Sequence, residues 1–469
     1  MKKELKRMIR VFVSVCILFV SLIVYLSYFQ IADAKDIKNN SYNKRLWIDE
    51  ESILRGMILD RNGKILAYSK KTGEEEIAKR YYNYGSLYSH IIGYSYREYG
   101  KSGLEATYNN ELLNLKDNAA LNEIQKMIKP NGEGNSIKLT VDHHIQEYAK
   151  SLLKGKKGSV IVMNPKTGEI YAMVSLPDFD VSTLRENWKT IVENPDSPFL
   201  NRATMGLYEP GSTFKVLTSI AALENFDEDK VIDCKGSVKI DGYTFKDYNG
   251  KGHGRVDLQE ALVESCNVYF TQIGVEIGKN KLGEVAEDFF INKSIPFDLS
   301  VKKSSFPFRE NISTTELAAS SIGQGKVRVT PLNMVMIASG IANGGNIVKP
   351  TLVKEVISPE GKVIKSIEPQ ILSQGVDGFT ANKVKNMMVE VVKRGTGTRA
   401  QIKNMRVAGK TGTAENSTGK THSWFIGFAP ADDAKVAVVV LLESDGSTGG
   451  KNAAPIAQKL MVETMNTIN

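Results

Sequence analysis

The sequence predicts an α+β protein whose main domain is built on a central antiparallel sheet flanked by helices. Strand-like segments open this domain at residues 159–175 and return at its end in residues 406–413, 423–429 and 435–443. Helix-like segments fill the interval, so we expect both ends of the domain to supply strands to one sheet. A further observation, an uncharged apolar stretch of residues 11–29, predicts that a membrane helix precedes this fold.

The composition fits a globular protein and excludes several classes of function. The chain has 469 residues, enough for two or three domains, with 42% hydrophobic and 24% charged residues. The formal net charge of +8 is spread along the chain without a dense basic block, so we expect no nucleic-acid partner. The three cysteines and five histidines show no spacing typical of a zinc site. We therefore expect neither a metal nor a cofactor.

The N-terminus carries a basic tail followed by the apolar stretch. Residues 1–10 contain five basic side chains: Lys2, Lys3, Lys6, Arg7 and Arg10. The nineteen residues of 11–29 would rise about 28 Å as a helix, close to a hydrocarbon core of about 30 Å. We expect residues 1–10 in the cytoplasm, a transmembrane anchor at 11–29 and an extracytoplasmic remainder. The alternative is a cleaved signal peptide, since Ala32-Asp-Ala34 resembles a cleavage site, but the apolar stretch exceeds the usual signal core.

Residues 30–150 form a predicted small α+β module, the pedestal, between the anchor and the main domain at 151–469. Arg55–Ala67 contains an Asn-Gly turn between two strand-like segments, which is typical of a hairpin. Residues 100–113 indicate a glycine-containing loop that leads into a helix, and a further amphipathic helix ends near Leu153. No residue pattern in this module indicates chemistry.

In the main domain, the turn at residues 164–168 joins two strands into a hairpin. The first-turn Pro331 suits a helix start. Helices are predicted at six places: residues 214–225, 257–278, 280–291, 330–343, 379–393 and 452–467.

The best candidate for a nucleophile is Ser212, in the segment Glu209-Pro-Gly-Ser-Thr-Phe-Lys215. Pro-Gly ends the preceding element and an apolar helix follows, so Ser212 lies near the first turn with Lys215 on the same face. The positive end of a helix and an adjacent amine together can activate a serine. Ser-x-x-Lys alone is a weak signal, because the chain has four other copies: Ser41/Lys44, Ser151/Lys154, Ser300/Lys303 and Ser417/Lys420.

Two later motifs separate this copy from the others. Ser265-Cys-Asn267 lies inside the helix predicted at residues 257–278, and Lys410-Thr-Gly-Thr413 lies on a predicted strand. Lys-Thr-Gly also begins at Lys71 and Lys166, but the sequence predicts a charged loop at the first and a hairpin turn at the second. Cys266 is interpreted as a small core residue, and a disulfide between Cys266 and Cys234 remains open.

The order Ser-x-x-Lys, Ser-x-Asn, Lys-Thr-Gly resembles penicillin-binding proteins and serine β-lactamases. The resemblance extends to class B penicillin-binding proteins, the peptidoglycan D,D-transpeptidases, and covers the chain from the anchor to its end. Seven further segments carry it: Arg55–Ala67, Gly103-Leu-Glu105, 164–173, Asn201-Arg-Ala, Ser321-Ile-Gly-Gln-Gly325, 395–400 and Trp424–Pro430. It implies a transpeptidase fold like that of the serine β-lactamases for residues 151–469, and a dimerisation-type pedestal.

The resemblance also implies a role for each motif residue. Ser212 would attack a D-Ala-D-Ala stem peptide of peptidoglycan, with Lys215 as the base, its pKa lowered by burial and by the cation of Lys410. Ser265 would relay a proton to the leaving amine. The remaining site residues would hold Lys215 or the substrate: Asn267, Lys410, Thr411, Gly412 and Thr413. Gly412 would let the substrate approach as an added strand, and the N–H groups of Ser212 and Thr413 would form the oxyanion hole.

Four other functions were weighed against this one. A class A penicillin-binding protein would need a glycosyltransferase domain, for which the 120 or so residues after the anchor are too few. A β-lactamase or a β-lactam sensor would share the motifs but not need the pedestal, and no Glu-x-x-Leu-Asn segment follows Ser265. A scaffold that activates a partner would not need the nucleophile. The family pairs with polytopic glycosyltransferases, so we expect such a partner, with β-lactams as covalent inhibitors.

Overall fold

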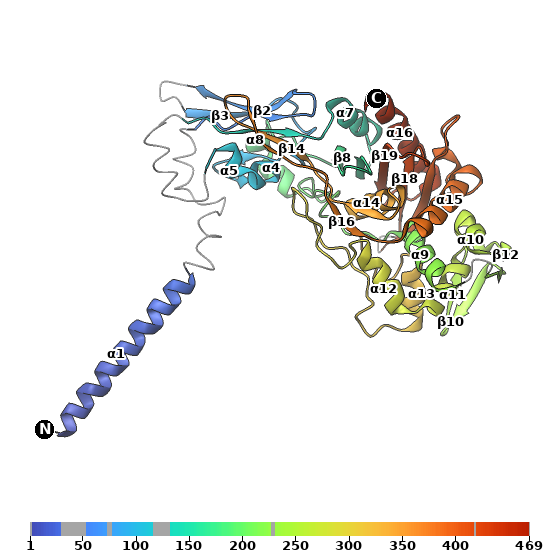
Figure 1. Cartoon of the computed structure of the whole chain (residues 1–469), viewed down its shortest axis with the longest axis horizontal. Coiled ribbons are helices and arrows are strands. Elements are labelled where there is room, and N and C mark those ends of the chain that lie inside the picture. Colours follow the sequence, from blue (N-terminus) through green and yellow to red (C-terminus); the bar gives the residue numbers. More distant parts are fainter. Residues whose placement is uncertain are drawn as a thin grey trace.

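A computed structural model of the chain describes residues 2–29, 53–72, 77–115, 132–226, 230–416 and 419–468. It contains an N-terminal helix, a mixed sheet near the start of the chain and a larger antiparallel sheet enclosed by helices (Figure 1). The predicted α+β class with a central antiparallel sheet is confirmed.

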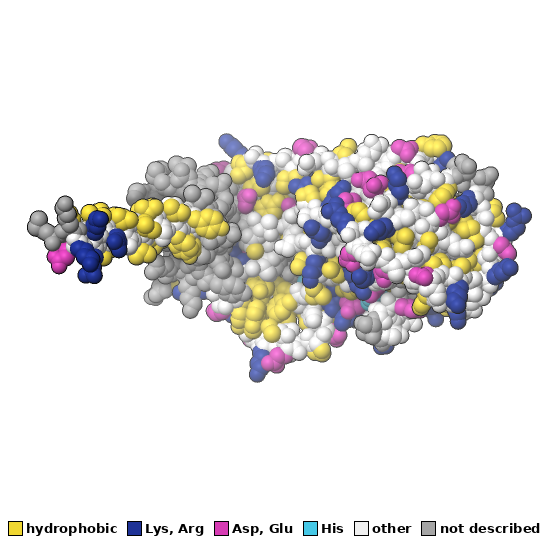
Figure 2. Space-filling model, turned by 90° about the horizontal axis from the view of Figure 1, so that it is seen from below, with side chains coloured by type: hydrophobic (Ala, Val, Ile, Leu, Met, Phe, Trp, Pro, Cys, Tyr) yellow, Lys and Arg dark blue, Asp and Glu magenta, His cyan; other side chains and the backbone are white. Residues whose placement is uncertain are grey.

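The N-terminal helix α1 spans Lys2–Tyr28, so the basic tail and the apolar stretch form one continuous helix. Its hydrophobic side chains, from Val11 to Tyr28, are exposed, as expected for a helix long and apolar enough to cross a membrane. Figure 2 shows the basic side chains gathered at its N-terminal end. The signal-peptide alternative depends on residues 32–34, which lie outside the described residues.

The pedestal sheet has six strands in the order β15-β14-β6-β1-β2-β3. Four come from the first part of the chain: β1 (Ile58–Leu59), β2 (Ile65–Thr72), β3 (Ile77–Tyr82) and β6 (Ser136–Leu139). The hairpin predicted within Arg55–Ala67 is confirmed as β1 and β2. The other two strands, β14 (Val353–Ile357) and β15 (Val363–Ser366), come from the second half of the chain. The sheet is therefore not confined to residues 30–150.

Two segments quoted for the family resemblance meet inside the pedestal. The carboxylate of Glu105, within the short helix α4 (Gly103–Thr107) that precedes α5 (Asn109–Leu112), is fully buried. It accepts hydrogen bonds from Arg55 Nε at 2.5 Å and from Arg80 Nε at 2.7 Å. Burial alone would raise the pKa of Glu105, but the two guanidinium groups outweigh it and lower that pKa. This buried ion triad ties β3 to α4.

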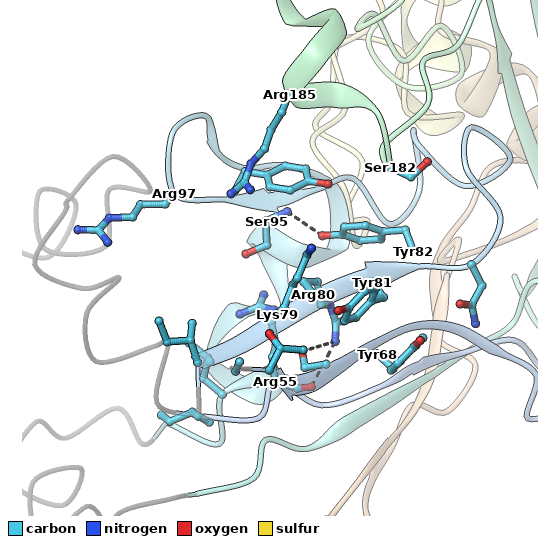
Figure 3. Close-up of a pocket in the computed structure, with 18 of the residues that line it drawn as sticks. Arg55, Tyr68, Lys79, Arg80, Tyr81, Tyr82, Ser95, Arg97, Ser182 and Arg185 are labelled. Atoms are coloured by element: carbon cyan, nitrogen blue, oxygen red, sulfur yellow. Dashed lines mark hydrogen bonds between the residues drawn. The ribbon is translucent and has the colours of Figure 1, made fainter. Parts of the chain in front are cut away.

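A cavity of about 680 Å³ opens beside this triad (Figure 3). Most of the lining residues labelled in Figure 3 are basic or aromatic. The hydroxyl of Tyr82 accepts a hydrogen bond from the backbone N–H of Ser95 at 2.8 Å. The side chains that line it include Arg55, Tyr68, Lys79, Arg80, Tyr81, Tyr82, Arg97 and Arg185. None of the predicted site residues lies there.

The central sheet has five antiparallel strands in the order β17-β18-β19-β7-β8. The hairpin β7 (Gly158–Met163) and β8 (Ile170–Leu176) begins the domain. Its last strands are β17 (Ala408–Glu415), β18 (Thr421–Ala429) and β19 (Val436–Leu442). Strands from both ends of the domain complete one sheet, as predicted, and β17 lies at its edge.

Helices cover both faces of this sheet (Figure 1). Along β7, Ile161 and Met163 pack in the same core as α14 (Pro331–Ala342), whereas Val160 and Val162 pack with α16 (Ala454–Ile468) and α7 (His143–Leu152). Continuous burial of the strands follows from this two-sided cover. The predicted domain boundary at residue 150 falls within α7, which packs on β8.

The remaining helices lie between the two ends of the sheet. They are α8 (Leu184–Val192), α9 (Lys215–Asn225), α10 (Leu258–Glu264), α11 (Asn267–Ile277), α12 (Lys279–Asp288), α13 (Thr314–Ser321) and α15 (Gly378–Arg394). The single helix predicted at residues 257–278 is wrong, because α10 ends and α11 begins across Ser265 and Cys266. The sequence did not predict α8, α13 or three small ribbons: β9 (Ile232–Cys234) with β12 (Gly254–Val256), β10 (Ser237–Ile240) with β11 (Tyr243–Lys246), and β13 (Asn346–Val348) with β16 (Ile371–Gln374).

Candidate active site

The candidate nucleophile lies at the junction of a 3₁₀ turn and a helix. Ser212 is the middle residue of η2 (Gly211–Thr213), and α9 begins three residues later at Lys215. Gly211 has φ +53°, and a Cβ there would approach the carbonyl oxygen of Thr413 to 2.8 Å. A glycine is therefore required both by the backbone conformation and by the close approach of β17. Ser212 is half-buried, whereas Lys215 is fully buried.

Two segments of the family resemblance hold η2 and the residues before it in place. The carbonyl oxygen of Gly323 accepts the N–H of Gly211 at 2.9 Å. The indole N–H of Trp424 donates to the carbonyl oxygen of Glu209 at 2.9 Å. A third segment is anchored next to the sheet, where the buried guanidinium of Arg202 pairs with Glu443, the residue after β19, at 2.7 Å. The position of Ser212 is thus fixed by residues far apart in the sequence.

The break between α10 and α11 presents the second motif to Lys215. Ser265 adopts a left-handed conformation with φ 58° and ψ 42°, a strained state for a residue with a side chain. Asn267 then opens α11, and its amide oxygen lies within reach of Lys215. Such strain at a helix junction is typical of functional sites.

Lys215 is held by two acceptors from this junction. Its Nζ donates to the carbonyl oxygen of Ser265 at 2.6 Å and to Oδ1 of Asn267 at 2.7 Å. A neutral amine has two N–H groups, so both can donate hydrogen bonds to these acceptors while the nitrogen lone pair stays free to accept a proton. The described hydrogen bonds include none between Lys215 and Ser212, although the i, i+3 spacing puts both on one face.

The third motif reaches the same serine from β17. Nζ of Lys410 donates to Oγ of Ser265 at 2.9 Å and to the carbonyl oxygen of Thr411 at 3.0 Å. Nζ of Lys215 lies 3.4 Å from the same Oγ. The hydroxyl of Ser265 therefore lies between two lysines, and the structure joins Lys215, Ser265, Asn267 and Lys410 in one network.

Both lysines are fully buried, and among the described residues neither forms an ion pair with a carboxylate. Burial lowers the pKa of Lys215 to about 8, while Cys266 and Asp247 partly oppose that shift. Burial, followed by repulsion from Lys215, lowers the pKa of Lys410 well below its usual value. Exclusion of water from the site thus favours the neutral, deprotonated form of one of the two lysines.

The hydroxyls of Thr411 and Thr413 also have partners outside β17. Oγ1 of Thr411 lies 2.7 Å from Oγ1 of Thr396, a residue of the segment at 395–400 to which the sequence assigned no role. Oγ1 of Thr413 accepts the N–H of Gly449 at 3.4 Å. Both threonines stand at the edge strand, where an added substrate strand would align.

The reason predicted for Gly412 is incomplete. A Cβ at Gly412 would approach the carbonyl oxygen of Pro210 to 2.8 Å and Cγ2 of Thr213 to 3.0 Å. The glycine is therefore required by packing of β17 against η2, the turn that carries Ser212. Substrate approach along the strand stays a prediction.

Gly412→Ala is therefore expected to displace η2 from β17. Overpacking of this kind costs about 1–3 kcal/mol of folding free energy. We expect a lower Tm together with at least about tenfold slower acylation by penicillin, since a shift of η2 moves the nucleophile. Thermal unfolding and stopped-flow labelling measure the two effects. Gly378→Ala, where no positive φ is needed and an added Cβ would meet only the carbonyl oxygen of Gly344 at 3.7 Å, is the control, and normal acylation in Gly412→Ala would contradict the packing argument.

The structure also brings together side chains that sequence spacing did not connect. The ligand atoms of Cys234, Asp247, His253 and Cys266 all lie within 4.8 Å of one another. Sequence spacing did not indicate this cluster, because residues spread over 33 positions meet through the β9–β12 ribbon and the α10–α11 break. Both buried cysteines are free thiols, so the disulfide left open is not formed in this structure.

Comparisons with known proteins agree with this geometry. The family described as the penicillin-binding protein transpeptidase domain matches residues 158–462, and the penicillin-binding protein A dimerisation domain matches residues 55–137. The peptidoglycan D,D-transpeptidase PbpA of Mycolicibacterium smegmatis is 32% identical over 96% of each chain. The stage V sporulation protein D of Bacillus subtilis is 34% identical over 82% of this chain and 64% of the relative.

Solved structures place the same fold on both parts of the chain. The ceftriaxone acyl-enzyme complex of penicillin-binding protein A from Mycobacterium tuberculosis has a TM-score of 0.82 at 31% identity, covering 89% of this chain and 99% of that one. A D,D-transpeptidase domain from Eggerthella lenta has a TM-score of 0.81 at 36% identity, covering 89% and 100% of the two chains. The chain belongs to the family of penicillin-binding protein transpeptidases.

Proposed function

We propose that the chain is a serine-type D,D-transpeptidase that cross-links peptidoglycan through an acyl-enzyme on Ser212. One observation carries the proposal. Lys215 is a fully buried amine whose two N–H groups have acceptors on Ser265 and Asn267, one helical turn after the nucleophile. An amine held in this way can act as a base.

In the first half-reaction, Oγ of Ser212 forms a bond to the carbonyl carbon between the two terminal D-alanines, and its proton passes to Lys215. The tetrahedral oxyanion is stabilised by backbone N–H groups, which we assign to Ser212 and Thr413. The C–N bond then breaks, and the amine of D-alanine takes a proton relayed by Oγ of Ser265. The contacts of that hydroxyl with both lysines support this relay.

The terminal carboxylate of the donor stem peptide would bind at Lys410, Thr411 and Thr413. A buried cation and two hydroxyls at an edge strand suit a carboxylate at the end of an added peptide strand. In the second half-reaction, an amine of a neighbouring stem peptide attacks the acyl-enzyme, forms the new amide and returns the proton to Ser212. A β-lactam presents a strained amide and a carboxylate to the same groups, so it would acylate Ser212 and remain bound.

The membrane topology and the partner are also proposals. The basic residues at the start of α1 support a cytoplasmic N-terminus and an extracytoplasmic site. A polytopic glycosyltransferase is the proposed partner, because the chain needs new glycan strands as a source of stem peptides. The pedestal, which follows α1 in the chain, is the part that we expect to contact it.

The test uses the purified full chain in detergent with a stem pentapeptide donor and an amine acceptor. We expect cross-linked product and free D-alanine in equal amounts, both measured by liquid chromatography with mass spectrometry. Penicillin is expected to leave a stable adduct. Rapid repeated hydrolysis of penicillin without cross-linked product would instead support the β-lactamase alternative and contradict the proposal.

A further inference from the structure

A polar pair that takes no part in the proposed acyl transfer lies beside the segment of the nucleophile. Glu209 stands three residues before Ser212. His422 is on β18, and its register partner on β17 is Ala414, which follows Thr413. We propose that Glu209 and His422 are positioning residues, which hold the segment of Ser212 against the sheet so that both N–H groups of the oxyanion hole converge. The inference rests on the proposed function, which assigns that hole to Ser212 and Thr413.

Two links join Glu209 to β18. Oε2 of its carboxylate lies 3.8 Å from Nε2 of His422, and its backbone carbonyl accepts the indole N–H of Trp424 at 2.9 Å. His422 and Trp424 are two residues apart on one strand, so their side chains share one face of β18. The ring of Tyr208 packs edge-on against both, with ring centroids 5.3 Å and 6.3 Å away. The residues before Ser212 are therefore held along one strip of the sheet.

Arg328 holds the other oxygen of the Glu209 carboxylate. Its Nη2 lies 2.7 Å from Oε1, and its Nη1 donates to the carbonyl oxygen of Gly325 at 2.8 Å. Two residues before Gly325, the carbonyl oxygen of Gly323 accepts the N–H of Gly211 in η2 at 2.9 Å. The carboxylate of Glu209 therefore connects β18 to the loop that anchors η2. The two halves of the oxyanion hole, one on η2 and one on β17, take their relative position from this connection.

The hydrogen bonds of His422 define where its proton lies. Nδ1 of the buried ring accepts the backbone N–H of Ser444 at 3.0 Å. A backbone N–H can only donate, so Nδ1 carries the lone pair, and the proton of a neutral ring lies on Nε2, toward Glu209. Burial lowers the pKa of His422 below its usual value. Three charged groups face the ring: Glu209 and Glu443 oppose this shift, and Arg328 adds to it.

Protonation of His422 would disrupt this arrangement. A second N–H, at Nδ1, would face the N–H of Ser444, and neither could accept from the other. Ser444 has little freedom to turn away. Its backbone is left-handed, with φ 50°, and its Oγ accepts the side-chain amide of Asn416 at 3.0 Å. The same amide nitrogen lies 3.3 Å from Nε2 of His422. The neutral ring is therefore the form that fits the network.

The first test measures acylation of the full chain in detergent by penicillin, with stopped-flow detection. Glu209→Gln removes the charge and keeps the shape, whereas His422→Asn keeps an acceptor near Nδ1 and removes Nε2. An oxyanion hole acts in the transition state, so in each variant the maximal acylation rate should fall at least about tenfold. The penicillin concentration that gives half of this rate should change less than about twofold. Either variant alone suffices if the other does not fold.

His90→Asn is the matched control, because it removes a second buried histidine. Nε2 of His90 lies 2.7 Å from the carbonyl oxygen of Pro198, a contact that involves neither η2 nor β17. We expect this variant to lower the Tm and to keep both kinetic constants. The control thus separates the general cost of losing a buried imidazole from the loss of a positioning contact.

The pH profile supplies the second readout. At pH values below the lowered pKa of His422, the wild type must lose two protons to react, one from Lys215 and one from His422. Its acylation rate should fall about a hundredfold per pH unit there, and that of His422→Asn only about tenfold. Equal slopes, or variants that lose Tm but acylate at the wild-type rate, would show that the pair is structural only. A raised half-saturating concentration with an unchanged maximal rate would also contradict the inference. A wild-type chain without any penicillin adduct would refute the proposed function, and the positioning role with it.

Discussion

Ser212→Ala is expected to abolish the covalent adduct with penicillin and the release of D-alanine. The alanine has no atom that can form the ester, so the remaining rate should fall by at least about 10⁴-fold, as for other serine nucleophiles. The fold should survive, because Ser212 is half-buried and the described hydrogen bonds give its hydroxyl no structural partner. Intact-protein mass spectrometry after incubation with penicillin measures the adduct, and thermal unfolding checks the fold.

The other Ser-x-x-Lys copies supply the matched control. Ser151 lies near the end of α7, where its hydroxyl donates to the carbonyl oxygen of Tyr148 at 2.7 Å, and Lys154 follows three residues later. Ser151→Ala should label with penicillin like the wild type. An adduct of full stoichiometry on Ser212→Ala, or a lost adduct on Ser151→Ala, would contradict the assignment of the nucleophile.

The large features of the fold could be predicted from the sequence because they depend on local signals. The strands of the central sheet show continuous apolar segments bounded by turn residues, and α14 begins at a proline. Local periodicity does not predict contacts between distant segments. The strands β14 and β15 join a sheet that begins some 290 residues earlier in the chain, and nothing in their sequence indicates that they pair with it.

The contacts within the candidate site could be predicted in part. Order and spacing single out the motif residues, and the structure places Lys215, Ser265, Asn267 and Lys410 in contact. The left-handed turn at Ser265 was missed, because an apolar stretch on both sides of it favours one helix. Asp247 was missed because it belongs to no motif and reaches the site only through the ribbon that carries it.

Lys215→Met is the second change with a large expected effect, because it removes the amine that we propose as the base and keeps most of the length of the side chain. General-base catalysis contributes about 10²–10⁴-fold, so the acylation rate at pH 8 should fall by about that factor. The pH profile should change as well. Since burial lowers the pKa of Lys215 to about 8, the wild-type rate should rise between about pH 6 and 9 as the amine loses its proton. At pH 7 about one tenth of the amine is neutral.

The pH profile distinguishes a base from a structural lysine. Three groups face Lys215: Asp247 and Cys266 favour its charged form, and Lys410 lies across Ser265. Lys410 must be charged to bind a carboxylate and its own pKa is lowered as well, so loss of its proton should lower the rate. Lys215→Met should lose the rising limb and keep the falling one, whereas the exposed Lys154→Met should keep both. A variant that is slower by the same factor at every pH would show that Lys215 only maintains the shape of the site, because loss of a titrating base must remove the pH dependence that the base creates.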